Sequence, residues 1–170
     1  FDEIGNSQKN KKGELVCKKP FPSMPIKFWN DDEDKKYKSA YFEKYDNIWH
    51  HGDFAKITQN GGFIIYGRSD TTLNPGGVRL GTAEIYNVVE KFDEIKESIS
   101  IGQSWDNDIR IILFVVFNKG HYLTKEIKDK IKKAIRLNAS PRHVPAKIIS
   151  VSEIPKTKNG KLVELAVKQC

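Results

Sequence analysis

The sequence predicts an α+β fold in which a short antiparallel or mixed sheet is flanked by helices. Two observations in the second part of the chain carry this prediction. Apolar residues recur at helical spacing in the segment 82–92 and again after residue 124. The segments 95–103, 110–117 and 146–151 are instead rich in β-branched and apolar residues and are bounded by turns, which indicates strands. Helices and strands therefore share one small domain.

Both expected helices begin at a threonine. Thr82 and Thr124 are the expected N-caps, because a threonine hydroxyl accepts a hydrogen bond from a free backbone amide of the first turn. Ser140-Pro141 is expected to close the second helix, whose lysines occupy the solvent face. The apolar stripe comprises Ile85, Val88, Val89 and Phe92 in the first helix, and Ile127, Ile131, Ala134 and Ile135 in the second.

The first part of the chain has a different pattern of apolar and charged residues, and we expect a β-rich unit there. The segments 13–17 and 62–66 have strand character, and an Asn-Gly-Gly turn leads into the second of them. Residues 31–45 are highly charged and favour a short helix. We therefore divide the chain into 1–69, the β-rich edge of a preceding domain, and 70–170, the small α+β domain.

Charge is distributed unevenly along the chain. The net charge is +7, but the residues from Lys119 onward include 13 basic and 4 acidic side chains, so the first 118 residues are slightly acidic. A basic second half favours a polyanionic partner, such as a nucleotide, coenzyme A (CoA), nucleic acid or an anionic membrane surface. A lysine-rich face that is merely solvated explains the pattern equally well.

Composition excludes several classes of protein. The chain has no run of about 18 apolar residues, which a transmembrane helix requires. The polar stretch after Phe1 has neither an initiator Met nor the apolar core of a signal peptide, so we expect a chain trimmed from something longer. Cys17 and Cys170 form no Cys-x-x-Cys pair, which predicts no disulfide or metal framework and suits a reducing, cytoplasmic compartment.

Two short motifs in the first part carry candidate ligand-binding side chains. In 49–53 (WHHGD), the Asp53 carboxylate can accept hydrogen bonds from both hydroxyls of a ribose. In 66–70 (YGRSD), Arg68 can hold a phosphate or ribose, and Asp70 can serve as a pivot at the domain boundary. An ordinary turn explains the Gly-Asp pair as well, and the two histidines are expected to be packed or solvated rather than to bind a metal.

Two further motifs lie in the second part. The loop that opens the first expected helix contains Gly76 and Gly77, which permit close approach by a chain-like or phosphate-bearing ligand, and Arg79 adds a charge. A plain turn that caps a helix explains these glycines almost as well. The loop 155–161 ends in Lys161, which follows a glycine in a segment expected to be exposed and flexible. Most lone exposed lysines are inert.

The order and spacing of these motifs are more specific than any one of them. GD, YGRSD, GGVRLGTAEI and PKTKNGK resemble the closing motifs of the adenylate-forming superfamily, which includes acyl-CoA synthetases, luciferases and peptide-synthetase adenylation domains. The resemblance covers essentially the whole chain from GELV onward, and its longer segments resemble the branch that activates acetoacetate. It implies that 1–69 is the edge of a large N-terminal adenylation domain and 70–170 a mobile C-terminal lid.

The resemblance implies a two-step ligase whose substrates are a short acyl carboxylate, ATP and CoA. In the first step the carboxylate attacks the α-phosphate of ATP, and positive charge from Mg²⁺ and a lysine offsets the repulsion between two anions. Lys161 matches that catalytic lysine, and Asp53 matches the residue that holds the ribose hydroxyls. Arg68 and Arg79 match nucleotide-binding arginines.

In the second step the small domain is expected to rotate about a hinge matching Asp70. This rotation withdraws Lys161 and presents the loop containing Gly76 and Gly77 to the pantetheine of CoA, whose thiol attacks the acyl-adenylate. Lys132 lies near the position where relatives place a basic residue against the CoA phosphates, among six basic residues on the same expected helix.

The chain departs from the superfamily pattern in two motifs. His51 stands where many relatives have a hydroxyl residue before Gly-Asp, which puts a direct phosphate contact in doubt. Gly76-Gly77-Val78-Arg79 replaces a frequent Ser-Gly-His-Arg, so contacts to CoA through a serine hydroxyl are lost. The phosphate loop and the acyl pocket belong to the upstream domain, which is the expected partner, so we expect the chain alone to be inactive.

Other functions remain open at this stage. The acyl substrate could be another short-chain acid, because the acyl pocket is absent from these residues. A non-catalytic basic module for CoA or nucleic acid is favoured by the charge, but the chain lacks an aromatic-plus-basic recognition signature, so we expect neither a nucleic-acid nor a membrane partner. A regulatory chain that docks onto a synthetase body is a further alternative.

Overall fold

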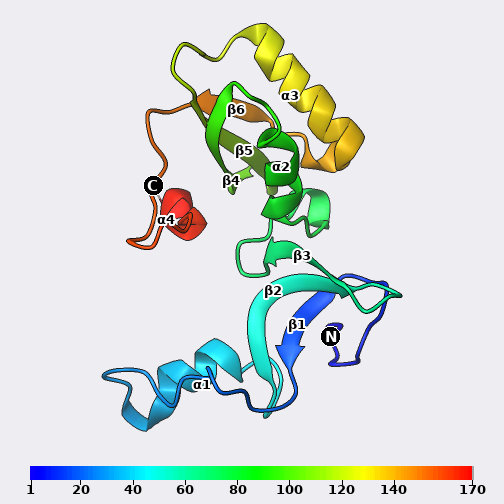
Figure 1. Ribbon diagram of the computed structural model, residues 1–170, viewed down its shortest axis with the longest axis vertical. Helices are drawn as coiled ribbons and strands as arrows, with labels where there is room; N and C mark the ends of the chain where they lie inside the picture. Colours follow the sequence, from blue (N-terminus) through cyan, green and yellow to red (C-terminus); the bar gives the residue numbers. More distant parts are fainter. Residues whose placement is uncertain (170) are drawn as a thin grey trace. The chain divides into compact units, whose positions relative to one another are not determined.

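The computed structural model describes residues 1–169, and the chain divides into two compact units, Phe1–Asp70 and Thr71–Cys170. Each unit has its own sheet, and each is described by itself (Figure 1). That the first unit is the edge of an adenylation domain, and that the second turns about Asp70, stay predictions.

The first unit is built on an antiparallel sheet in the order β1-β2-β3 (Figure 1). β1 is Gly13–Cys17, β2 is Trp49–Ile57 and β3 is Phe63–Arg68, so the two expected strands are confirmed. β2 contains the WHHGD motif, which therefore lies in a strand rather than in a loop. Gly52 has a φ of 80° within this strand, and the pairing of β1 with β2 is irregular beside it.

The expected charged helix is confirmed as α1, Lys35–Tyr41, which follows the 3-10 turn Asp32–Asp34. Aromatic packing joins this helix to the sheet. The Tyr41 ring stacks on the ring of the buried Trp49 with their centroids 3.7 Å apart. Phe42 meets the same indole edge-on with a centroid distance of 5.8 Å. Stacked and edge-to-face contacts both stabilise such clusters, so Trp49 is the anchor of this unit.

The second unit has a mixed sheet in the order β4-β5-β6, in which β4 and β5 are antiparallel while β5 and β6 are parallel. Its α+β composition confirms the predicted fold class. The elements are α2 Thr82–Val89, β4 Ile95–Trp105, β5 Asp108–Phe117, α3 Lys125–Asn138, β6 Lys147–Ser150 and α4 Glu164–Gln169.

Alternate residues of β5 belong to two separate apolar clusters, because successive side chains of a strand point to opposite faces. Leu113 and Val115 belong to the main core, together with Ile85 of α2 and Ile131 of α3. Phe114 and Val116 instead belong to a smaller cluster with Ile99, Ile154 and Val167 of α4. Helices α2 and α3 therefore cover one face of the sheet, and α4 packs against the other (Figure 1).

The two threonines expected as N-caps behave differently. Thr124 is confirmed, because its hydroxyl accepts a hydrogen bond of 3.2 Å from the Ile127 amide. Thr82 was wrongly assigned: Gly81 occupies the N-cap position, and Thr82 is the buried first residue of α2. Thr82 thus packs into the interior at the start of α2 and does not cap that helix. No helix within residues 1–169 has the length and apolar character needed to cross a membrane.

Candidate functional site

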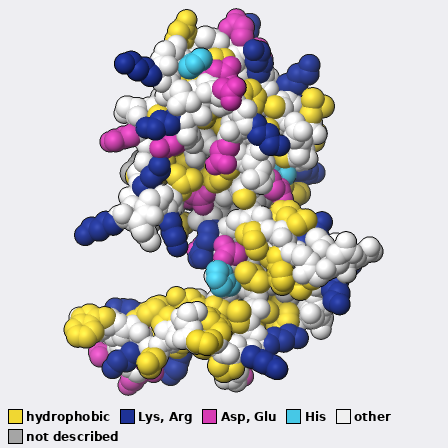
Figure 2. Space-filling model, in the orientation of Figure 1, with side chains coloured by type: hydrophobic (Ala, Val, Ile, Leu, Met, Phe, Trp, Pro, Cys, Tyr) yellow, Lys and Arg dark blue, Asp and Glu magenta, His cyan; other side chains and the backbone are white. Residues whose placement is uncertain are grey.

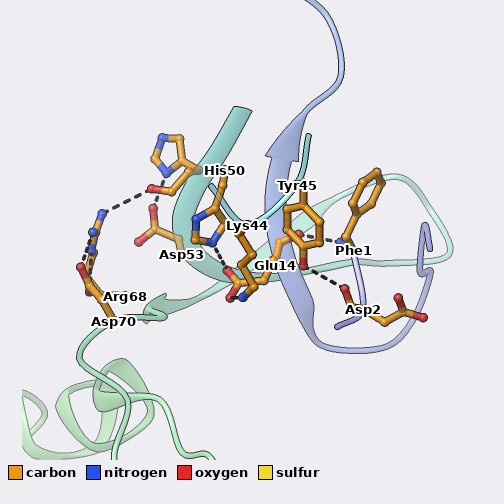
Figure 3. A network of polar contacts seen from close by, with 10 residues as sticks. Phe1, Asp2, Glu14, Lys44, Tyr45, His50, Asp53, Arg68 and Asp70 are labelled. Atoms are coloured by element: carbon orange, nitrogen blue, oxygen red, sulfur yellow. Dashed lines mark hydrogen bonds and ion pairs between the residues drawn. The ribbon is translucent and has the colours of Figure 1, made fainter. Parts of the chain in front are cut away.

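A pocket of about 650 Å³ lies in the first unit, where β2 begins and β3 ends. Arg68 and Asp70, two of the predicted site residues, line it, whereas Asp53 is not among its lining residues. Its other ionisable lining side chains include Glu14, Lys44, His50 and His51. The pocket thus collects ionisable groups from β1, β2, β3 and the segment after α1 (Figure 3).

Arg68 and Asp70 form one two-point ion pair (Figure 3). Arg68 Nε donates to Asp70 Oδ1 at 3.0 Å, and Nη2 donates to Oδ2 at 2.5 Å. Hydrogen bonding to Asp70 raises the pKa of the Arg68 guanidinium, against the opposing effect of burial. The sequence assigned these residues separate roles in nucleotide binding and hinge motion, and the fold brings the two side chains together.

Asp53 is held by its own strand. Its carboxylate contacts His51 Nδ1, because residues two apart in a strand share one face. Gly52 lies between them with its φ of 80°, and a Cβ there would stand 3.0 Å from Arg68 Nη2. The glycine thus allows the Arg68 guanidinium to approach β2. Arg68 Nη1 also donates to the His51 carbonyl at 3.4 Å, so the backbone just before Gly52 binds this guanidinium as well.

Sequence reasoning missed a buried carboxylate that lines the same pocket as Arg68. Glu14 is only 7% exposed, and its carboxylate contacts Lys44 Nζ and, at 3.0 Å, His50 Nε2 (Figure 3). Burial alone would raise the pKa of the Glu14 carboxyl, but hydrogen bonds from Lys44, His50 and Ser69 outweigh it and hold that pKa below its ordinary value. The available signal was a glutamate inside the otherwise apolar strand GELVC.

In the second unit, the loop with Gly76 and Gly77 has a defined conformation. Both glycines have left-handed backbones, with φ values of 58° and 75°. The Gly76 amide donates to both carboxylate oxygens of Asp108, at 2.8 and 3.1 Å. Hydrogen bonds from the Ile109 and Gly76 amides lower the pKa of the Asp108 carboxyl. Asp108, which the sequence did not single out, therefore fixes this loop from the start of β5.

Lys161 lies on an exposed, closed turn (160 and 161 are both exposed) rather than in a segment without internal contacts. Lys156 pairs with Leu162 as an isolated β-bridge, and the Thr157 amide donates to the Lys161 carbonyl at 2.9 Å. The Lys161 amide donates back to Thr157 Oγ1 at 3.0 Å. Gly160 has a φ of 80°, which this turn requires. The lysine side chain thus projects from a hydrogen-bonded hairpin.

Lys132 lies on α3 among the six basic residues expected from the sequence. On the face drawn in Figure 2, the basic side chains of the second unit are interspersed with acidic ones and do not form one patch. Within residues 1–169, no three His, Cys, Asp or Glu side chains are grouped so that they could hold a metal ion. The described residues therefore offer no all-protein site for the Mg²⁺ that the resemblance implies, an ion that one or two carboxylates commonly hold together with substrate phosphates.

Residues 84–161 match the family model of the AMP-binding enzyme C-terminal domain. This match covers most of the second unit, from within α2 through the mixed sheet and α3 to the Lys161 turn. The chain therefore contains the C-terminal domain of AMP-binding enzymes.

The chain is also similar, over nearly its whole length, to acetoacetyl-CoA synthetases. It is 57% identical over 168 residues to the acetoacetyl-coenzyme A synthetase of Rhizobium meliloti, covering 99% of this chain and 26% of the relative. It is 48% identical over 171 residues to the acetoacetyl-CoA synthetase of Mus musculus, covering 25% of it. The expected resemblance to the acetoacetate-activating branch is confirmed, and the chain spans about a quarter of these relatives.

Solved structures agree with this placement. The acetoacetyl-CoA synthetase from Streptomyces lividans has a TM-score of 0.91 and 44% identity, covering 99% of this chain and 25% of that one. A benzoate CoA ligase from Burkholderia xenovorans has a TM-score of 0.80 at 23% identity, which shows the same fold. Neither comparison tests the roles of individual residues, so the assigned roles of Asp53, Arg68, Arg79 and Lys161 stay predictions.

Proposed function

We propose that this chain is the C-terminal part of an ATP-dependent acid–CoA ligase, which converts acetoacetate, ATP and CoA into acetoacetyl-CoA, AMP and diphosphate. The observation that carries the proposal is the 57% identity to an acetoacetyl-CoA synthetase over 99% of the chain. The remainder of the site, including the acyl pocket, is assigned to an upstream N-terminal domain of the same protein. The chain alone is then inactive.

Asp53, Arg68 and Arg79 are proposed to contact the nucleotide. The Asp53 carboxylate accepts hydrogen bonds from the two ribose hydroxyls, exchanging part of its contact with His51 for them. The Arg68 guanidinium has five N–H donors, of which its pair with Asp70 uses two and the His51 carbonyl a third. Donors therefore remain for a phosphate oxygen while Asp70 keeps the guanidinium in place.

Lys161 is proposed as the catalytic residue of the adenylation step. A carboxylate oxygen of the acid forms a bond to the α-phosphorus of ATP, and the bond from that phosphorus to the bridging oxygen breaks, which releases diphosphate. An ammonium group beside the α-phosphate offsets the negative charge that meets there. The hairpin at 157–161 carries this charge on an exposed surface, so the group can enter a site built by another domain. Mg²⁺ is assigned to that domain.

The second step is proposed to use the other loop of the same unit. Rotation about Asp70 withdraws Lys161 and brings the loop of Gly76 and Gly77 to the pantetheine chain. The CoA sulfur attacks the acyl carbon, and AMP leaves with the electrons of the broken C–O bond. Asp108 supports this role because it holds the Gly76 amide and so fixes a loop without bulky side chains. Lys132 on α3 is the weaker candidate for a CoA phosphate contact.

Two alternatives remain distinguishable from this proposal. An acyl-CoA synthetase for another short-chain acid shares every residue discussed above and differs only in the upstream acyl pocket. A non-catalytic basic module for CoA or nucleic acid is supported by the basic second half of the chain. Titration with RNA at two salt concentrations separates this module, because nucleic-acid affinity that rests on phosphate contacts falls steeply with salt. A cytoplasmic location stays a prediction.

The decisive experiment compares two half-reactions in the full-length protein that carries this chain. Adenylation is followed by acid-dependent exchange of diphosphate into ATP, and thioester formation by adding CoA to preformed acyl-adenylate. Lys161→Ala is expected to reduce the first activity to a small residual rate and to spare the second. Acetoacetate is tested beside acetate and butyrate to identify the acid. Acid-dependent diphosphate release by residues 1–170 alone, or full adenylation by Lys161→Ala, would contradict the proposal.

A further inference from the structure

The Tyr86 hydroxyl connects α2, β4 and α4 at a single point. It donates a hydrogen bond of 2.5 Å to Glu164 Oε1 and accepts one of 3.0 Å from the Ser100 amide. Because β4 is an edge strand, the Ser100 amide can point away from its partner strand β5 and is available to a side chain. Burial and the Glu164 carboxylate both raise the pKa of the Tyr86 phenol, which keeps it a donor.

Glu164 is the first residue of α4, and it follows the Lys161 turn by three positions. A six-residue helix has little stability of its own, so its position depends on tertiary contacts. Among these contacts, Val167 packs into the apolar cluster of Ile99 and Ile154, and Glu164 bonds to Tyr86. The start of α4, and with it the exit from the Lys161 turn, is therefore set by Tyr86.

The entrance to the same turn is also fixed to β4. Lys156 Nζ forms an ion pair of 2.8 Å with Glu97 Oε1, and Lys156 forms a β-bridge with Leu162 across the base of the turn. Both stems of the segment 157–161 are thus attached to the sheet, on either side of an exposed tip. The Lys156 pair is a partly exposed ion pair, and such pairs contribute little to stability, whereas the Tyr86–Glu164 hydrogen bond joins two partly buried side chains.

We propose that Tyr86 is a positioning residue for the adenylation step, acting through Glu164 to hold the turn that carries Lys161. This inference rests on the proposed function, because it assigns Tyr86 to the same lysine. Misplacing a reacting group by about 1 Å can slow a step by about a hundredfold. A turn with one stem released remains hydrogen-bonded internally, so a smaller loss, about tenfold, is expected.

The test uses the full-length protein and the two half-reactions described above. Tyr86→Phe retains the ring and removes only the hydroxyl. It is expected to lower kcat of adenylation about tenfold and to leave thioester formation from preformed acyl-adenylate unchanged, because Lys161 is withdrawn in that step. Tyr122→Phe is the matched control, since Tyr122 is 72% exposed and far from the turn in sequence, and it should change neither rate.

Double variants show whether Tyr86 acts through its proposed partners. Glu164→Ala should reproduce Tyr86→Phe, and the two together should lose no more than either alone, because both remove one hydrogen bond. Glu164→Gln retains an acceptor oxygen and should recover part of the rate. In the Lys161→Ala background, Tyr86→Phe should have no further effect on the residual adenylation rate. Glu164→Ala also serves as the test if Tyr86→Phe fails to fold.

The outcomes separate the two proposals. If Lys161→Ala leaves adenylation intact, the proposed function fails, and the positioning role fails with it. If Lys161→Ala reduces adenylation to a small residual rate but Tyr86→Phe and Glu164→Ala do not slow it, only the positioning role is overturned. A similar loss in both half-reactions, or a further loss in the Lys161→Ala background, assigns Tyr86 to general stability and also overturns the positioning role.

Discussion

Replacing Gly77 by alanine tests whether the proposed CoA loop needs its left-handed backbone. Gly77 has a φ of 75°, and a Cβ at this position meets no atom within 4 Å, so alanine fits without a clash inside the chain. Its cost is conformational: a left-handed backbone disfavours a residue with a Cβ by about 1 kcal/mol. At 1.4 kcal/mol for a tenfold change, the present loop conformation is disfavoured about fivefold.

Gly120→Ala is the matched control for this prediction. Gly120 lies in the same unit with a φ of 90°, and a Cβ there also meets no atom within 4 Å. Both variants therefore carry the same kind of strain, but only one lies in the proposed loop. In the full-length protein, Gly77→Ala is expected to slow thioester formation from preformed acyl-adenylate by at least about fivefold while adenylation is retained. Gly120→Ala should change neither. Equal effects of the two variants, or a loss confined to adenylation, would refute the reasoning.

Three further predictions concern the hinge, the core and the buried carboxylate. Asp70→Pro locks φ near −65° and should impair thioester formation while adenylation survives; equal loss of both half-reactions counts against the hinge. Ile131→Ala removes a side chain with no exposed surface and should lower the free energy of unfolding in urea by about 2–5 kcal/mol. The control Leu137→Ala, on the same helix but 72% exposed, should lower it by less than about 0.5 kcal/mol. Equal losses in the two variants would refute the assignment of Ile131 to the core. Because the pKa of Glu14 is lowered on folding, its ionised form stabilises the fold above its ordinary pKa, and this contribution disappears as pH falls through the folded pKa. Glu14→Gln should flatten that acid dependence in thermal unfolding, and an unchanged profile would show that Glu14 does not cause it.

The pair between Arg68 and Asp70 has a consequence for the proposed hinge. If Asp70 changes its backbone conformation during rotation, the two-point geometry with Arg68 must change as well, because the residues are only two positions apart. A guanidinium that binds nucleotide in one state could then lose its orientation in the other. Nucleotide contact and domain rotation would be coupled through one side-chain pair.

Much of the second unit follows from local spacing. The β-branched and apolar run of β5, bounded by turns, and the apolar stripe of α3 gave the correct elements, because both signals depend only on residues close together in the sequence. Thr124 was assigned correctly since its partner amide lies only three residues away. Thr82 was not, because its burial depends on what packs over the start of α2. The order of the motifs was likewise sufficient to indicate the family.

The contacts that organise the candidate site could not be predicted from the spacing of nearby residues. Glu14 meets residues 30 and 36 positions away, Gly76 meets Asp108 across 32 positions, and Tyr86 meets Glu164 across 78. Such pairs depend on strand register and on which sheet face each helix covers, and neither is encoded in the spacing of nearby residues. The sequence by itself determined that a lysine turn and a glycine loop are present. Only the tertiary structure decided which side chains hold them, because those side chains become neighbours when the sheet and helices pack.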